Sequence, residues 1–203
     1  MLIGYLRCTE IPEESIPEAE FQVVEKKKRK PKEPEKGQKG TKRPIIIDGL
    51  NIAKTFGNHL YGTDNKLYSS KGLIACYEYF KKRKYDDKLI TIVLKHIPDH
   101  LWDNKEILED LRQKKIVVDA RGRTLNNERM LQDDDTLALD IAKTIGGIIV
   151  TCDFYRNHFD RATTYRDVIQ YRLLQPTYFH EEITFHPEPN GSSGPKLKDI
   201  LLF

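Results

Sequence analysis

The sequence predicts a three-layer α/β/α domain, in which helices cover both faces of a central, mainly parallel sheet. From residue 44 onward, short runs of β-branched and other apolar residues alternate with stretches whose apolar residues recur at helical spacing. Strands that alternate with helices in this way are typical of βαβ units, which build parallel sheets with right-handed crossovers.

The first strand is expected at residues 45–47, where three isoleucines precede Asp48 and Gly49. A β-branched run that ends at Asp-Gly is typical of a buried strand followed by a turn. The later elements are expected in this order: a polar stretch at 56–69, a helix at 71–83 capped by Ser69 or Ser70, a strand at 89–97, a helix at 104–115 capped by Asp103, a strand at 116–118, a loop, a helix at 136–145 opened by Asp133, Asp134 and Asp135, a strand at 148–153, a last helix at 164–174 and an edge strand at 178–185.

The domain is expected to span residues 43–203 and to follow an N-terminal arm and basic linker at 1–42. Residues 25–43 hold ten Lys or Arg against three Glu, a net charge of +7 in a chain of +3, so the remainder carries −4. This composition is typical of disorder. The KKKRK run at 26–30 has three interpretations, namely a solvated linker, a nuclear-localisation patch, or a non-specific contact with RNA phosphates.

Several classes of protein are disfavoured. No apolar run approaches the roughly 20 residues that span a bilayer, and no basic segment precedes the apolar N-terminus, so neither a membrane span nor a signal peptide is expected. Cys8, Cys76 and Cys152 are too scattered for a disulfide framework or a zinc module, which favours a reducing, intracellular compartment. The chain has no P-loop, GxGxxG or nucleophile motif. Only His158 of the six histidines lies near the proposed site, and a histidine general base is not expected.

Acidic residues recur at one edge of the predicted sheet. Asp48 and Asp153 each end a strand, and Asp134 and Asp135 open the helix that leads to the strand of Asp153. If the first and fourth strands are neighbours, these carboxylates converge at the switch point of the sheet. Their mutual repulsion is best offset by a hard divalent cation, and oxygen ligands favour Mg²⁺ or Mn²⁺. The alternative is that each Asp only caps a helix or occupies a turn.

Four segments resemble, in order and spacing, the NYN (PIN-like) ribonuclease domain of the Regnase, or MCPIP, family. They are RPIIIDGLNIA (43–53), SSKGLIACYEYF (69–80), QDDDTLALDIA (132–142) and IIVTCDFYRNHF (148–159). The resemblance covers roughly residues 43 to 203 and includes the closing GPKLKDIL. It implies a PIN-like fold and an Mg²⁺-dependent endoribonuclease that cleaves single-stranded RNA through a metal-activated water.

The resemblance assigns roles residue by residue. The metal-binding aspartates fall on Asp48, Asp134, Asp135 and Asp153, and the family's Asn falls on Asn51, which would orient these ligands. The residues expected to bind RNA are Lys71, Arg121, Arg123, Arg129 and Arg156, with Lys71 in place of the family's usual Arg. The chain departs from the family at Leu50, where Ser or Thr is usual, and at Asn157, where many members have a fifth Asp that meets a metal-bound water.

The resemblance further implies single-stranded RNA or mRNA as the partner, a homodimer, and proteins of RNA decay or RNA silencing. The expected location is the cytoplasm, including RNA granules, and the KKKRK run makes the nucleus an alternative location. The three cysteines cannot form the family's CCCH zinc finger. Two rival functions are an NYN domain that has lost activity and serves as an RNA-binding or dimerising scaffold, and a small-molecule phosphatase on a similar sheet.

Overall fold

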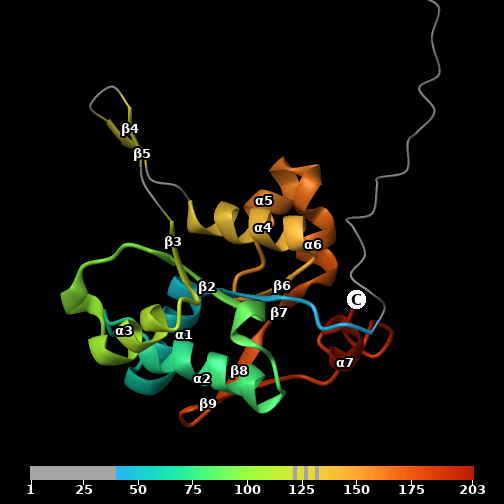
Figure 1. The fold of residues 1–203 in the computed structure, drawn as a ribbon, viewed down its shortest axis with the longest axis horizontal. Coiled ribbons are helices and arrows are strands. Elements are labelled where there is room, and N and C mark those ends of the chain that lie inside the picture. Colours follow the sequence, from blue (N-terminus) through green and yellow to red (C-terminus); the bar gives the residue numbers. More distant parts are fainter. Residues whose placement is uncertain (1–39, 121–122, 126–127, 131–132) are drawn as a thin grey trace, which may run out of the picture. The chain divides into compact units, whose positions relative to one another are not determined.

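The computed structural model describes residues 40–120, 123–125, 128–130 and 133–203, without the side chains of 123–125 and 128–130. Five parallel strands form the central sheet in the order β3-β2-β1-β6-β7 (Figure 1). The strands are β1 (Ile45–Asp48), β2 (Ile90–Lys95), β3 (Val117–Ala120), β6 (Ile148–Val150) and β7 (Leu173–Leu174). The chain adds β2 and β3 on one side of β1 and then β6 and β7 on the other, so the switch point lies between β1 and β6.

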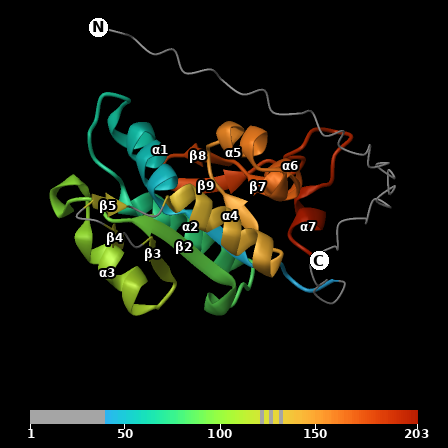
Figure 2. The ribbon, with the colours of Figure 1, turned by 90° about the horizontal axis from the view of Figure 1, so that it is seen from above.

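Helices cover both faces of this sheet, which confirms the α/β/α prediction. On one face lie α1 (Gly49–Tyr61), α2 (Ser70–Lys82) and α3 (Lys105–Gln113), and on the other α4 (Asp134–Ile145), α5 (Arg156–Arg161) and α6 (Arg166–Tyr171). Because side chains alternate along a strand, Ile45 and Ile47 pack in the core below α1 and α2, whereas Ile46 packs against α4. Figure 2 shows α4 lying across the sheet, over β1 and its neighbours.

Helix α1 begins directly at the end of β1, although a polar stretch was expected for much of its length. Its buried face is formed by Ile52, Ala53 and Phe56, whose spacing is helical but is hidden by the polar residues between them. Gly49 permits the sharp entry, because a Cβ there would lie 2.7 Å from the carbonyl oxygen of Val93 in β2. The strand end at Asp48 is thereby held close to β2.

The prediction that Asp103 caps the third helix is wrong. Asn104 caps α3 instead, through its Oδ1 and the backbone N–H of Ile107. Oδ1 of Asp103 accepts the backbone N–H of Ser70 at 2.8 Å and also its hydroxyl, so Asp103 caps the start of α2. The reason is tertiary, since α2 and α3 pack together and Asp103 lies between their first turns.

The C-terminal third differs from the prediction in two places. The expected edge strand at 178–185 is a separate antiparallel hairpin, β8 (Pro176–Phe179) and β9 (Glu182–Phe185), which packs on α2. The expected last helix ends at Tyr171, and β7 takes the edge of the sheet. The remaining elements are the hairpin β4 (Arg123–Leu125) and β5 (Glu128–Met130), the 3-10 helices η1 (Asp87–Leu89), η2 (Asp99–Leu101) and η3 (Thr163–Tyr165), and α7 (Leu197–Ile200).

The described residues begin with a segment that pairs with the C-terminus. The backbone N–H of Gly40 donates to the carbonyl of Phe203, and the N–H of Phe203 donates to Thr41. Arg43 donates to the carbonyls of Leu202 and Gly146, and its guanidinium lies 4.5 Å from the Phe203 ring centroid. Residues 1–39 of the predicted arm lie outside the described residues. Within the described part of the chain, none of the helices combines the length and apolar character that crossing a membrane requires.

Candidate active site

Asp48 lies at the switch point, at the junction of β1 and α1, and is only 4% exposed. Its Oδ1 accepts the backbone N–H of Asn51 at 3.4 Å, which is a helix cap. Its Oδ2 accepts the hydroxyls of Thr151 at 2.8 Å and Tyr155 at 2.9 Å. Burial raises the pKa of Asp48, whereas these three hydrogen bonds oppose that shift by stabilising the charged form. Asp48 therefore caps α1 and also belongs to a group of acidic side chains.

The loop after β6 is fixed by hydrogen bonds to its neighbours. Oδ1 of Asn51 accepts the backbone N–H of Cys152 at 2.8 Å, which ties the first turn of α1 to this loop. The N–H of Asp153 donates to Thr151 Oγ1, and Asp153 Oδ1 accepts the N–H of Tyr155. Tyr155 adopts φ 48°, a left-handed backbone conformation that is unusual for a tyrosine. The turn directs the Tyr155 ring into the core while Asp153 remains exposed.

Asp134 and Asp135 lie in the first turn of α4, as expected. The pKa of Asp135 is raised to about 7, first by burial and then by the charges of four aspartates. These are Asp48, Asp133, Asp134 and Asp153. The structure thus brings together the four predicted aspartates at one edge of the sheet, and Asp133 joins them.

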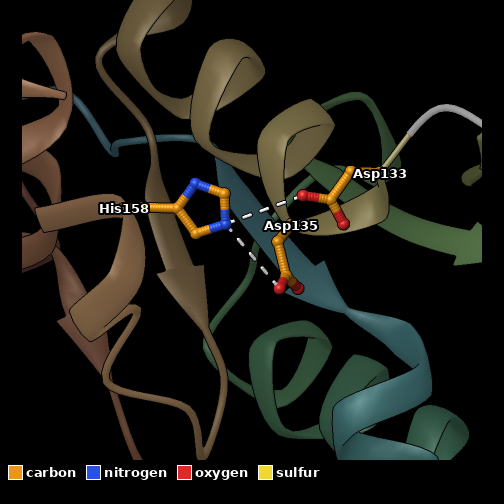
Figure 3. Close-up of side chains that lie close together, drawn as sticks. All are labelled: Asp133, Asp135 and His158. Atoms are coloured by element: carbon orange, nitrogen blue, oxygen red, sulfur yellow. Dashed lines mark ion pairs between the residues drawn. The ribbon is translucent and has the colours of Figure 1, made fainter. Parts of the chain in front are cut away.

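His158 on α5 also faces this cluster (Figure 3). Its Nε2 lies 3.6 Å from Oδ2 of Asp133 and 3.9 Å from Oδ2 of Asp135. Among the described residues, these three side chains form a group whose ligand atoms all lie within 4.8 Å of one another. From the sequence, His158 was expected only near the site, and Asp133 only at the start of the helix. The sequence feature that could have placed His158 in the cluster is its position five residues after Asp153.

A pocket of about 370 Å³ opens beside the cluster. Its lining residues come from the start of α4, the loop before α5 and the first turn of α5: Asp135, Asp153, Phe154, Tyr155, Arg156, Asn157 and His158. Asn157, a position at which the sequence departs from the expected family pattern, is therefore a wall residue of this pocket. Leu50 packs against the core beneath α1 and α2 and does not line the pocket.

The predicted RNA-binding residues are dispersed. Arg156 is exposed in the pocket wall, with its guanidinium 5.5 Å from the ring centroid of Phe154. Lys71 pairs instead with Glu181 at 2.6 Å and lines a different groove between α2 and β9. Arg123 and Arg129 lie on β4 and β5, with their side chains outside the described part of the structure. Arg121 also lies outside the described residues.

The donor set fits a hard divalent cation. Among the described side chains, Lys and Arg form no ion pair with Asp48, Asp134, Asp135 or Asp153, so neither residue type offsets the repulsion among these carboxylates. Burial first, and then this repulsion, raise the pKa of Asp135. Carboxylate oxygens in such number suit Mg²⁺ or Mn²⁺, and the imidazole of His158 is a ligand that Mn²⁺ accepts more readily than Mg²⁺.

A parallel sheet of this order, with aspartates at the end of β1, in the loop after β6 and at the start of α4, defines a PIN-like (NYN) domain. The sequence matches the family described as the Zc3h12a-like ribonuclease NYN domain over residues 41–199. The chain belongs to this family, and the resemblance seen in the sequence is confirmed.

Known proteins support the assignment. The chain is 26% identical over 163 residues to the endoribonuclease rege-1 of Caenorhabditis elegans, an alignment that includes 78% of this chain and 24% of that protein. The chain thus spans about a quarter of this relative's length. A crystal structure of the nuclear proteinaceous RNase P 2 of Arabidopsis thaliana matches with a TM-score of 0.50 and 19% identity, over 73% of this chain and 30% of that one. A second structure of that protein gives a TM-score of 0.49, 17% identity and coverages of 72% and 30%. The structure with a TM-score of 0.50 shows that its protein and this chain share a fold.

Proposed function

We propose that this chain is a metal-dependent endoribonuclease that cleaves single-stranded RNA by attack of water on the phosphodiester. The observation that carries the proposal is the convergence of Asp48, Asp135 and Asp153, with Asp134, at the switch point, without a Lys or Arg among the described side chains to neutralise them. The family membership and the similarity to rege-1, an endoribonuclease, favour this chemistry over others.

The four aspartates would hold Mg²⁺ or Mn²⁺. When bound, the ion supplies a water of lowered pKa and neutralises charge on the phosphate. Other residues of the protein hold these aspartates in place and in their charged form. Thr151 and Tyr155 donate to Asp48 and favour its ionised form, and Asn51 holds the loop of Asp153 in place. Arg156, at the pocket wall, would bind a neighbouring phosphate.

The proposal also covers how the RNA substrate is recognised and the cellular process in which the protein acts. Recognition through backbone charge makes weak sequence preference and strong salt dependence the expected behaviour. We extend the proposal to mRNA decay or RNA silencing in the cytoplasm. A homodimer, RNA-decay partner proteins and a contribution of the basic run at 26–30 to RNA affinity belong to the same proposal.

The test is cleavage of end-labelled single-stranded RNA under titration with Mg²⁺ and Mn²⁺, and with EDTA. Asp48→Asn should lower the rate by at least about 100-fold, because a ligand charge at the metal is lost. Asp64→Asn is the matched control and should cleave as the wild type does, since Asp64 is exposed in the loop after α1 and does not line the pocket. Thermal unfolding checks that both variants fold.

Three results would contradict the proposal. Equal rates for Asp48→Asn and wild type would remove Asp48 from the site. RNA binding without cleavage in either metal would favour the scaffold function. Release of phosphate from mononucleotides with the long RNA left intact would favour the phosphatase.

A further inference from the structure

Phe154 is an exposed aromatic side chain in the wall of the candidate active site. It follows Asp153 directly, lines the same pocket as Asp135 and Asp153, and is 56% exposed. The next residue, Tyr155, is buried. The left-handed turn at Tyr155 therefore leaves one aromatic ring in the core and the other at the pocket. An exposed phenyl ring contributes little to the fold, because its apolar surface stays in water.

The surroundings of this ring indicate which ligand it suits. The guanidinium of Arg156 lies 5.5 Å from the ring centroid, so a cation and an aromatic face occur together at the pocket. Nucleic-acid-binding surfaces combine these features, because the ring stacks on a base and the cation binds the adjoining phosphate. Since Phe154 adjoins Asp153, a base on this ring would belong to a nucleotide beside the phosphate at the acidic cluster.

We propose that Phe154 stacks on an unpaired nucleobase next to the scissile phosphate and so positions the RNA in the site. This inference rests on the proposed ribonuclease function and adds the residue that holds the base. Every base has a π-face, so the contact favours single-stranded over paired RNA without strong base preference. Phe154 acts on binding and leaves the chemistry to the acidic cluster.

Three variants separate stacking from a general effect on the fold. Phe154→Ala should weaken binding of a short single-stranded RNA by roughly 5- to 150-fold, the range for loss of one stacked base. Phe154→Trp keeps an aromatic face and should retain affinity. Phe179→Ala is the matched control, because Phe179 is 68% exposed on β8 and does not line the pocket, and it should bind as the wild type does.

Fluorescence anisotropy of labelled RNA, with Ca²⁺ and separately with EDTA, measures these affinities without relying on turnover. A set of RNAs with single abasic sites then tests the contact itself. In the wild type, one or two positions should lose affinity as Phe154→Ala does, and in Phe154→Ala the same positions should cause no further loss. With Mg²⁺, the change should appear in KM, with kcat retained.

The outcomes separate this inference from the proposed function. If wild type cleaves RNA and Phe154→Ala binds and cleaves equally well, the stacking proposal falls and the ribonuclease stands. If Phe154→Ala weakens every abasic RNA as much as the intact one, stacking is also excluded. If wild type shows the base-dependent affinity but no cleavage, the stacking stands and the ribonuclease falls. Absence of RNA binding would overturn both.

Discussion

The hydroxyl of Tyr155 donates to Oδ2 of Asp48 over 2.9 Å, and both side chains are buried. The two residues are 107 positions apart in the chain and come from the loop after β6 and the end of β1. Burial disfavours the charge on Asp48, and the phenol with Thr151 counteracts that penalty. The contact thus couples the loop that carries Asp153 to the ionisation of Asp48.

Replacing the phenol should affect both stability and activity. In Tyr155→Phe, Asp48 loses a hydrogen bond, and the free energy of unfolding should fall by about 1.5–3 kcal/mol at neutral pH, as for hydrogen bonds to charged groups. The pKa of Asp48 should rise further, so the pH profile of RNA cleavage should shift to higher pH. Urea denaturation and a pH–rate profile measure the two effects.

Tyr165→Phe is the control for this substitution. Tyr165 donates to the exposed Asp140 at 2.6 Å, and its loss should cost under about 1.5 kcal/mol and leave the pH profile unchanged. Equal effects of the two substitutions would show that the buried contact has no special part in the site.

The acidic cluster should make the metal-free protein less stable as pH rises. The folded pKa of Asp135 is raised to about 7 from 3.8, so between these values the native state holds a proton that the unfolded state releases. The contribution of Asp135 to the free energy of unfolding is therefore largest below about pH 4 and declines as the pH rises to about 7. In EDTA, Asp135→Asn should raise Tm relative to wild type at pH 7 to 8 but not at pH 4. Asp140→Asn, on the exposed face of α4, alters only the acceptor of the Tyr165 hydroxyl and should show no gain of Tm at pH 7 to 8. Identical curves for Asp135→Asn and wild type would contradict the raised pKa.

Metal binding should reverse that trend. Because a bound cation favours the ionised carboxylates, binding displaces the proton of Asp135 and should strengthen from pH 6 to pH 8. A 100-fold excess of Mg²⁺ or Mn²⁺ over Kd stabilises the fold by about 2.7 kcal/mol. The expected result is a larger rise in Tm with metal at pH 8 than at pH 6, reduced in Asp135→Asn. A shift of Tm that is the same at both pH values would argue that Asp135 is not a ligand.

Asp103 should stabilise the fold without acting in cleavage. Burial raises its pKa, but the hydrogen bonds from Ser69 and Ser70 outweigh burial and hold the pKa below its usual value. Its contribution is thus present above about pH 4, the unfolded pKa, and is lost as pH falls through the lower folded pKa. Asp103→Ala should cost about 1–2 kcal/mol at pH 7 and much less in acid. The control Asn104→Ala removes the α3 cap and should show no such acid dependence, and a loss of RNA cleavage in folded Asp103→Ala would contradict a purely structural role.

Local sequence patterns were enough to predict the α/β class and the edge of the sheet at which the aspartates lie. These patterns are the isoleucine run of β1, the apolar run of β2 and the aspartates at the start of α4. Each is local, because a buried strand or the start of a helix selects the types of consecutive residues. The roles of the aspartates and of the predicted RNA-binding residues stay predictions, and the structure brings the aspartates together.

The contacts between distant segments depend on how the elements pack and could not be predicted from local patterns. The second half of α1 was expected as a polar stretch because polar residues mask its short buried face, and the cap of α2 comes from Asp103, 33 residues beyond Ser70. The approach of His158 to Asp133, and of Tyr155 to Asp48, depends on how α4 and the loop after β6 pack on the sheet. Periodicity reports which residues are buried, whereas the partner of a buried polar group depends on which segments the packed core brings side by side.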